Sequence, residues 1–174
     1  MTIPNLIIRD ETTSDVAGIR ALTATAFENM KISDHTEQYV IDGLRDAGAL
    51  TVSLVADLDG KLVGHIAFSP VSMSDSTPGW YGLGPVSVLP AHQRQGMGKA
   101  LIQAGLARLQ EMGAKGCCLV GHPEYYGQFG FVHPYGLVHE GVPPEAFFAL
   151  SLAGPMPLGK VQFHPAFFVS GPQA

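Results

Sequence analysis

The spacing of apolar residues over the first fifty positions predicts one strand and two helices. Residues 6–9 form a short apolar run that is typical of a strand, and residues 13–15 carry side chains that cap helix N-termini. Apolar positions then recur at helical spacing, at Val16, Ile19, Leu22, Ala26 and Phe27. A second helix is predicted over residues 34–46 and ends at Gly48. Each helix is therefore expected to turn one face toward a core.

The pattern then changes to that of a β-hairpin. Residues 50–58 and 62–71 are rich in β-branched and apolar residues, and the pair Asp59-Gly60 between them is a hairpin turn signal. Because successive side chains of a strand point to opposite faces, the second strand should show one face made of Val63, His65, Ala67 and Ser69, and another made of Leu62, Gly64, Ile66 and Phe68.

A third strand is predicted to be irregular in its middle. Residues 72–79 form a polar loop, and residues 80–89 are an apolar run behind it. Gly82, Gly84 and Pro85 interrupt this run. Glycine or proline inside a strand often marks a bulge, so a bulge is expected here, although a twisted edge strand would look the same.

The rest of the chain alternates between helix and strand. The predicted elements are, in order, a helix over residues 96–112, a buried strand over 115–120, a short helix over 124–129, a strand at 131–132, a helix over 145–152 behind two prolines and a last strand over 161–164. This order predicts one α/β domain over residues 1–174 with a mixed sheet. Its core spans about 6–132, and residues 133–174 complete the sheet.

Composition supports one compact domain and disfavours several classes of partner. Of 174 residues, 46% are apolar and 14% are charged, which allows a sizeable core. A net charge of -5 and a pI of about 5.7 disfavour nucleic acid and membrane surfaces as partners. No apolar run reaches the ~18 residues that a membrane helix needs. The start of the chain does not read as a signal peptide, so a cytoplasmic protein is expected.

The cysteines and histidines give no sign of a metal site. Cys117 and Cys118 are adjacent, and neighbouring residues on a strand point to opposite faces, so no disulfide is expected between them. Neither cysteine lies at ligand spacing from a histidine. The sequence therefore predicts a protein without a metal, from a reducing compartment.

The carboxylates are distributed unevenly along the chain. Residues 76–110 contain no Asp or Glu, yet Arg94, Lys99 and Arg108 lie there. Such a segment in an acidic protein either faces an anion or is largely buried, and charge alone leaves both readings open.

The strongest local signal is the glycine loop at residues 93–98, which lies between a strand and a helix. The first N–H groups of a helix lack internal partners and carry partial positive charge, and glycine lets the backbone approach an anion closely. The loop therefore predicts a phosphate site. A Walker loop is excluded because Ala100 follows Lys99 where a hydroxyl is needed. A dinucleotide fingerprint is excluded because its third glycine is absent.

The loop does match the pattern Q/R-x-x-G-x-G/A, through Gln93, Gly96 and Gly98. In this it resembles the GNAT superfamily of N-acetyltransferases. Tyr126, four residues before a Gly-Phe pair, matches the family's second signature. The run over residues 121–131 is similar to a bacterial subgroup with a Y-Y-x-x-F-G-F signature.

The resemblance implies a fold and a co-substrate. The fold would have a mixed, mostly antiparallel sheet with a bulged strand and helices on both faces. The co-substrate would be acetyl-CoA, with its pyrophosphate on the loop and its pantetheine arm beside the bulged strand. The residues implied to contact it are Val86, Ser87, Val88, Gln93, Arg94, Gln95, Gly96, Met97, Gly98, Lys99, Ala100, Tyr126 and Phe129.

Tyr126 is the implied general acid, since a phenol with a pKa near 10 is protonated at neutral pH. Tyr125 is expected to be structural. The general base is left open, because residues 80–89 lack the Glu that many relatives carry there. A water relay, or an amine that binds already neutral, would need no dedicated side chain. The residues that could act as the base are His65, His122, Glu124, His133 and Asp75.

Two further readings stay open at the level of sequence. A non-catalytic acyl-CoA sensor on the same fold would keep the loop, and a domain with an empty site could act through protein contacts alone. The acceptor of an enzyme would be an amine of a small molecule or peptide, with the segment over residues 27–46 and the loop at 72–79 setting its identity. The phenylalanines of the tail are expected to complete the core, with a homodimer surface as the alternative.

Overall fold

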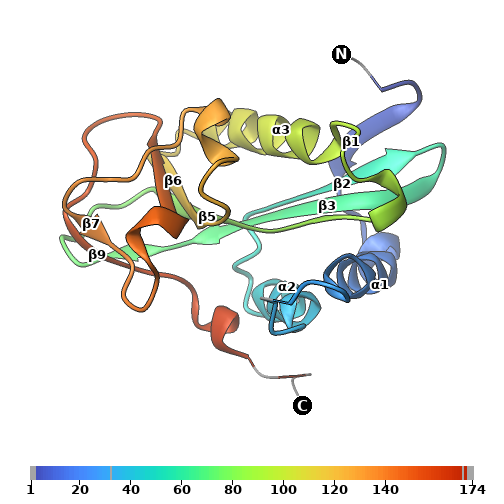
Figure 1. Cartoon of the computed structure of the whole chain (residues 1–174), viewed down its shortest axis with the longest axis horizontal. Coiled ribbons are helices and arrows are strands. Elements are labelled where there is room, and N and C mark those ends of the chain that lie inside the picture. Colours follow the sequence, from blue (N-terminus) through green and yellow to red (C-terminus); the bar gives the residue numbers. More distant parts are fainter. Residues whose placement is uncertain (1–2, 32, 170, 172–174) are drawn as a thin grey trace.

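A six-stranded sheet forms the centre of the computed structural model, which describes residues 3–31, 33–169 and 171 (Figure 1). The strands lie in the order β1-β2-β3-β5-β6-β8. All neighbours pair antiparallel except β5 and β6, which are parallel. The strands are β1 (Leu6–Asp10), β2 (Val52–Leu58), β3 (Lys61–Pro70), β5 (Trp80–Val88), β6 (Gly116–Val120) and β8 (Phe147–Ser151).

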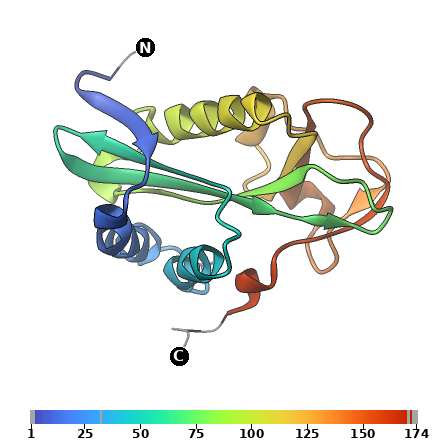
Figure 2. The same ribbon diagram turned by 180° about the vertical axis from the view of Figure 1, so that it is seen from behind.

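Helices cover both faces of this sheet. Helices α1 (Val16–Phe27) and α2 (Glu37–Asp46) lie on one face, and α3 (Met97–Glu111) lies on the other, as Figure 2 shows from behind. The predicted fold class is thus confirmed: the sheet is mixed and mostly antiparallel, with helices on both sides. The largest apolar cluster fills the layer under α3, and includes Leu54, Ile66, Phe68, Leu101, Ile102 and Leu109.

A small second sheet packs against the end where β5 and β6 pair. It consists of β4 (Ser72–Met73), β9 (Gly159–Gln162) and β7 (Leu137–Val138), in that order. Met73 and Phe163, from this part of the chain, share a buried cluster with Trp80 and Cys118 of the large sheet. The loop predicted over residues 72–79 therefore begins with a strand.

The prediction of a helix over residues 145–152 is wrong. The structure has one 3-10 turn (Pro144–Ala146) and then strand β8, which pairs along its whole length with β6. Phe147 packs under the small sheet, whereas its neighbour Phe148 packs under α3. A strand buried on both faces is apolar at every position, so its sequence has no alternation that separates it from a buried helix.

The predicted alternation along β3 fails at its first residues. A bulge leaves Val63 without a partner between the pairs Ala56–Gly64 and Asp57–Leu62. Leu62 consequently lies against Gly18 of α1, while Val63 joins the cluster under α3. Beyond Gly64, the side chains alternate between the two faces as predicted. The strand predicted at residues 131–132 is reduced to a single bridge between Val132 and Ala149.

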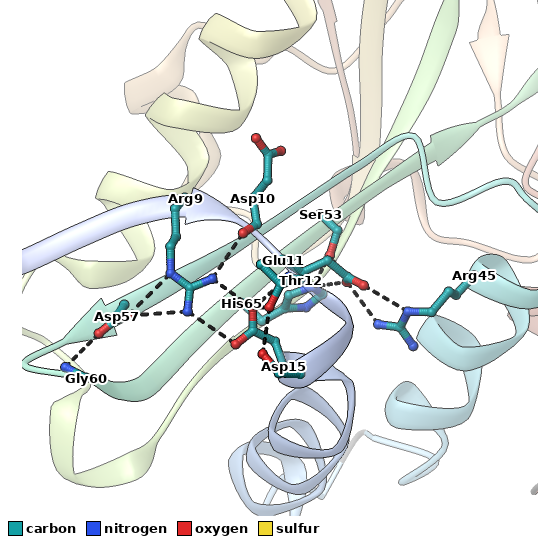
Figure 3. A network of polar contacts seen from close by, with 11 residues as sticks. Arg9, Asp10, Glu11, Thr12, Asp15, Arg45, Ser53, Asp57, Gly60 and His65 are labelled. Atoms are coloured by element: carbon teal, nitrogen blue, oxygen red, sulfur yellow. Dashed lines mark hydrogen bonds and ion pairs between the residues drawn. The ribbon is translucent and has the colours of Figure 1, made fainter.

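An ion-pair cluster joins β1 to the start of α1 (Figure 3). Arg9 donates to both carboxylate oxygens of Asp15, at 2.8 and 3.2 Å, and pairs with Asp57 of β2 at 3.3 Å. Asp15 also accepts from the backbone N–H of Thr12 at 2.7 Å, which completes a capping box. The hydrogen bonds from Arg9 and Thr12 outweigh the effect of burial and lower the pKa of Asp15 to about 2.

We expect Asp15 to make folding stability depend on pH in acid. Its folded pKa is below that of the unfolded chain, so its contribution is complete above about pH 4 and is lost as the pH falls toward 2. The contribution is at most about 2.5 kcal/mol, because the shift from 3.8 to about 2 is worth ~1.4 kcal/mol per pKa unit. Urea titrations of the wild type and Asp15→Asn should therefore differ most near pH 5 and converge near pH 2. Asp46→Asn, at an exposed site on α2, is the control that should keep the wild-type dependence.

Candidate functional site

The parallel strands β5 and β6 separate after three residue pairs. Pairing joins Trp80 to Gly116, Tyr81 to Cys117 and Gly82 to Cys118. From Leu83 onward β5 pairs with β3 only, and the end of β6 pairs with β8. In the described chain, the edge of β5 that faces β6 is thus left without a strand partner toward its carboxyl end, which opens a gap in the middle of the sheet.

A bulge accompanies this separation, as the sequence predicted. Ala67 of β3 stands opposite two residues of β5, Gly84 and Pro85, between the pairs Ile66–Val86 and Phe68–Leu83. Gly84 has a φ of 130°, a backbone region that side chains rarely permit. The extra residue bends β5, so the second half of the strand runs in a different direction from the first half.

The glycine loop connects the end of β5 to the N-terminus of α3. Gly96 has a φ of 91° and is the N-cap residue of α3, and no side chain caps this helix end. Its first N–H groups are therefore available to an anion. Gln93 donates from Nε2 to the carbonyl of Val88 at 2.9 Å, which ties the loop to the end of β5. Arg94 and Lys99 are exposed and form no ion pair with any residue that the structure describes.

The segment after β6 meets the loop at the same edge of the sheet. A methyl group built on Gly98 would lie 3.7 Å from the Tyr125 hydroxyl and 3.9 Å from Cγ2 of Val88. The bare backbone of Gly98 thus faces space between the two strand ends. In open sheets with parallel strands, ligands bind just beyond the carboxyl ends of the strands, which is where this space lies. The sequence predicted a structural role for Tyr125. Its position next to Gly98 in the fold indicates a role at the site instead.

Tyr126 lies deeper than Tyr125, in an aromatic cluster. Its ring centroid is 6.0 Å from that of Phe131 and 5.8 Å from that of Phe148, and a side chain on Gly121 would overlap the ring. Burial raises the pKa of Tyr126 to about 12, so the phenol stays protonated at neutral pH. Phe129 is half-buried beside the same ring, at 6.4 Å.

The side chains of the residues expected on β5 point to opposite faces of the sheet. The side chains of Val86 and Val88 pack toward the cluster under α3, and Ser87 is buried on the opposite face, across from His65. Met97 is a core residue at 1% exposure, so its backbone alone is available to a ligand. The side chains of five other expected residues, in the loop and the first turn of α3, are exposed or half-exposed, namely Gln93, Arg94, Gln95, Lys99 and Ala100.

The structure also narrows the set of possible bases. Asp75 accepts from Thr77 and from the backbone of Leu158, so it serves its own loop. His133 is bonded through Nδ1 to the carbonyl of Phe147 at 3.1 Å. His122 and Glu124 are exposed. Only His65 among the five is fully buried, and it lies directly opposite Ser87 of β5.

Within residues 3–31, 33–169 and 171, no three metal-binding side chains gather at one place. None of the helices formed by these residues has the length and apolar character needed to cross a bilayer. Cys117 and Cys118 are free and buried, and burial raises the pKa of both thiols, which makes them poor nucleophiles.

Comparison with known proteins agrees with this geometry. Residues 17–131 match the model of the Acetyltransferase (GNAT) family. An uncharacterized N-acetyltransferase of Escherichia coli, YhbS, is 35% identical over 127 residues, which cover 72% of this chain and 73% of YhbS.

Two solved structures resemble the whole chain. A GNAT family acetyltransferase from Brucella melitensis, in complex with acetyl-CoA, is 47% identical with a TM-score of 0.84, over 93% of this chain and 97% of that one. YhbS in complex with CoA is 32% identical with a TM-score of 0.85, over 98% and 97% of the two chains. The family match and these relatives show that the chain belongs to the GNAT family of acetyltransferases.

Proposed function

We propose that the chain transfers an acetyl group from acetyl-CoA to an amine of a small molecule or peptide. The observation that carries the proposal is the gap between β5 and β6, which ends at the uncapped N-terminus of α3. The gap can receive an extended pantetheine arm, and the helix N-terminus can receive its pyrophosphate. The complexes of the Brucella melitensis relative with acetyl-CoA and of YhbS with CoA support this assignment.

The loop fits the phosphates through its backbone. The N–H groups at the start of α3 point to the helix N-terminus, where an anion is stabilised by the helix dipole. Gly98 keeps this approach open, since it carries no side chain toward the gap. Arg94 and Lys99 add positive charge nearby, and the absence of carboxylates over residues 76–110 leaves that charge unopposed along this segment.

The free edge of β5 would hold and polarise the thioester. Backbone groups of Val86, Ser87 and Val88 can pair with the amides of the arm, in place of the missing strand. An N–H of Val86 or Val88 would donate to the thioester carbonyl as negative charge develops on its oxygen. The attacking amine nitrogen forms a C–N bond with the carbonyl carbon, and the C–S bond breaks.

Tyr126 would serve the leaving sulfur. In the described chain no hydrogen bond engages its hydroxyl, and its high pKa keeps the proton on the oxygen until charge appears on the sulfur. The phenol can then donate a hydrogen bond and finally a proton to the thiolate. We infer a cytoplasmic protein, because the proposed reaction needs a supply of acetyl-CoA. A homodimer stays a prediction of the sequence.

Calorimetry and a thiol-release assay test the proposed reaction together. We expect micromolar binding of acetyl-CoA, followed by release of CoA thiol with at least one member of an amine panel. The panel holds a polyamine, an aminoglycoside, an arylalkylamine and a peptide with a free N-terminus and one lysine. Binding without release for every amine would favour an acyl-CoA sensor, and no binding would exclude both functions.

Replacing Gly98 should weaken cofactor binding without harming the fold. A side chain at Gly98 meets only ordinary contacts in the free protein, yet it would occupy the space next to the first turn of α3. We expect Gly98→Val to raise the Kd for acetyl-CoA about tenfold or more, at ~1.4 kcal/mol per factor of ten. Ala107→Val, on the exposed face of the same helix, controls for the lower helix propensity of valine. An unchanged Kd for Gly98→Val would refute the loop assignment.

The two neighbouring tyrosines should give opposite effects when each loses its hydroxyl. Tyr126→Phe should lower kcat at least tenfold and leave the Kd for acetyl-CoA within about twofold, because a proton donor acts in the transition state. Tyr125→Phe should raise the Kd and change kcat less, because this hydroxyl lies next to Gly98. Stopped-flow turnover and calorimetry on both variants separate the roles, and the reverse pattern would exchange them.

A further inference from the structure

His65 lies in the middle of β3, on the face of the sheet that α1 and α2 cover. It stands across from Val55 of β2, and Val55 packs against Ile19 of α1 and Ile41 of α2. On its other side it stands across from Ser87 of β5, just beyond the bulge. None of the His65 surface is exposed. A histidine thus sits one strand away from the point where the thioester is proposed to bind.

The hydrogen bonds of His65 fix which ring nitrogen carries its proton (Figure 3). Its Nε2 lies 2.7 Å from Oγ of Ser53, and Ser53 donates its only hydroxyl hydrogen to Glu11. A carboxylate can only accept, so Ser53 must accept from Nε2–H. The ring is therefore the Nε2–H tautomer, and its Nδ1 bears an unshared electron pair.

Nδ1 of His65 has no hydrogen-bond partner within the described chain, and it is not alone on this face. Oγ of Ser87, opposite His65, and Oγ of Ser69, on the other side of the bulge, are also buried without partners. Thr23 adds a fourth such atom from α1, which packs on β3 and β5. An unsatisfied buried polar group costs ~1–3 kcal/mol, so four of them on this side of the sheet indicate a place built for a polar ligand or its water.

We propose that His65 is the general base of the acetyl transfer, which takes the proton of the attacking amine at Nδ1, directly or through one water. The proposal rests on the acetyltransferase function above. As the amine nitrogen forms its bond to the carbonyl carbon, one N–H proton moves to Nδ1 and the ring becomes an imidazolium. Ser53 and Glu11 are positioning residues: they hold the productive tautomer, and the Glu11 carboxylate, 4.0 Å from Nε2, stabilises the cation.

The charge on His65 in the resting protein suits this role. Burial lowers the pKa of His65 to about 4, and the nearby Glu11 carboxylate only partly opposes that effect. The ring is therefore neutral at pH 7, and the Glu11 carboxylate has to stabilise the imidazolium for Nδ1 to accept a proton. Two charged groups affect the pKa of His65: Glu11, which follows β1 in the chain, and Arg45 of α2. The residues on the flanking strands, Ser53 and Ser87, are uncharged.

The surroundings of Glu11 keep it ionised, so that it can hold the tautomer through every turnover. Glu11 and Ser53 line a cavity of about 290 Å³ at the ends of β1 and β2, together with Arg45 of α2. Arg45 donates to both oxygens of Glu11 at 2.9 Å and lowers the pKa of Glu11 despite burial, so Glu11 stays a carboxylate that accepts from Ser53. After the transfer the imidazolium gives its Nδ1 proton to water, which restores the Nε2–H tautomer.

The test compares His65→Gln with the wild type, using the panel amine that gives the fastest thiol release. At pH 7 we expect kcat to fall ~100-fold or more, as for other losses of a general base. The Kd for acetyl-CoA should stay within about twofold. The loss should shrink as the pH rises toward 9, because hydroxide can then accept the proton that the amine loses during the attack. A loss that is equal at all pH values, or no loss, would overturn the proposal.

The positioning residues give a graded second arm. Glu11→Gln should lower kcat about tenfold, because it removes the charge that stabilises the imidazolium. Asp42→Asn is the matched control, since Asp42 also contacts Arg45 but on the side away from Glu11. Equal losses for the two variants would show that only the stability of α2 is at stake, and would count against the proposal.

One measurement decides the proposal even if no panel amine is acetylated or His65→Gln does not fold. Nitrogen-15 NMR of the wild type reports the tautomer of each imidazole, and difference spectra with Glu11→Gln identify the His65 signals. A neutral ring with its proton on Nε2 at pH 7 is the expected result. A proton on Nδ1 would refute the proposal, whereas failure of the acetylation assay alone would refute the proposed function.

Discussion

The arrangement of the site depends on two parallel strands that pair for three residues and then part. Each strand remains satisfied on its other side, β5 by β3 and β6 by β8, so the gap costs only one row of backbone hydrogen bonds. The bulge at Gly84 and Pro85 re-aims β5 at the point of separation. The segments that continue from the two strands therefore meet at one edge of the sheet: α3 begins after β5, and Tyr125 and Tyr126 come after β6.

Most of these helices, strands and turns could be predicted from local patterns in the sequence. The periodicities of α1 and α3, the Asp59-Gly60 turn and the glycine loop each depend on neighbours within about ten positions, and all were predicted. Strand β8 was not, because both of its faces are buried. The bulge at Val63 carries no glycine or proline to mark it, and the two-residue strands β4 and β7 are too short to show any period. The contacts between Glu11, Ser53 and His65 join three separate elements, and only the register of the sheet brings them together.

The interior on the α1 and α2 side is more polar than stability alone would favour. Buried hydroxyl groups of Thr23, Ser69 and Ser87 lack partners in the described chain, and replacing each by an apolar residue of similar size would be neutral or stabilising. The layer under α3, by contrast, is apolar throughout. Both faces of the sheet bury apolar side chains, but the face under α1 and α2 also keeps polar groups whose benefit would appear only when a polar molecule is present.

On the proposed function, the uncapped end of α3 would link the lifetime of the protein to metabolism. A helix that lacks an N-cap frays more easily, and an anion bound there supplies the missing partners. A ligand that binds only the folded chain stabilises it by RT ln(1 + [L]/Kd), about 2.7 kcal/mol at a hundredfold excess over Kd. On the proposed function, a cell rich in acetyl-CoA would therefore protect this chain from proteolysis, and a starved cell would lose it sooner. The abundance of the enzyme would then follow the supply of its own substrate without any change in gene expression.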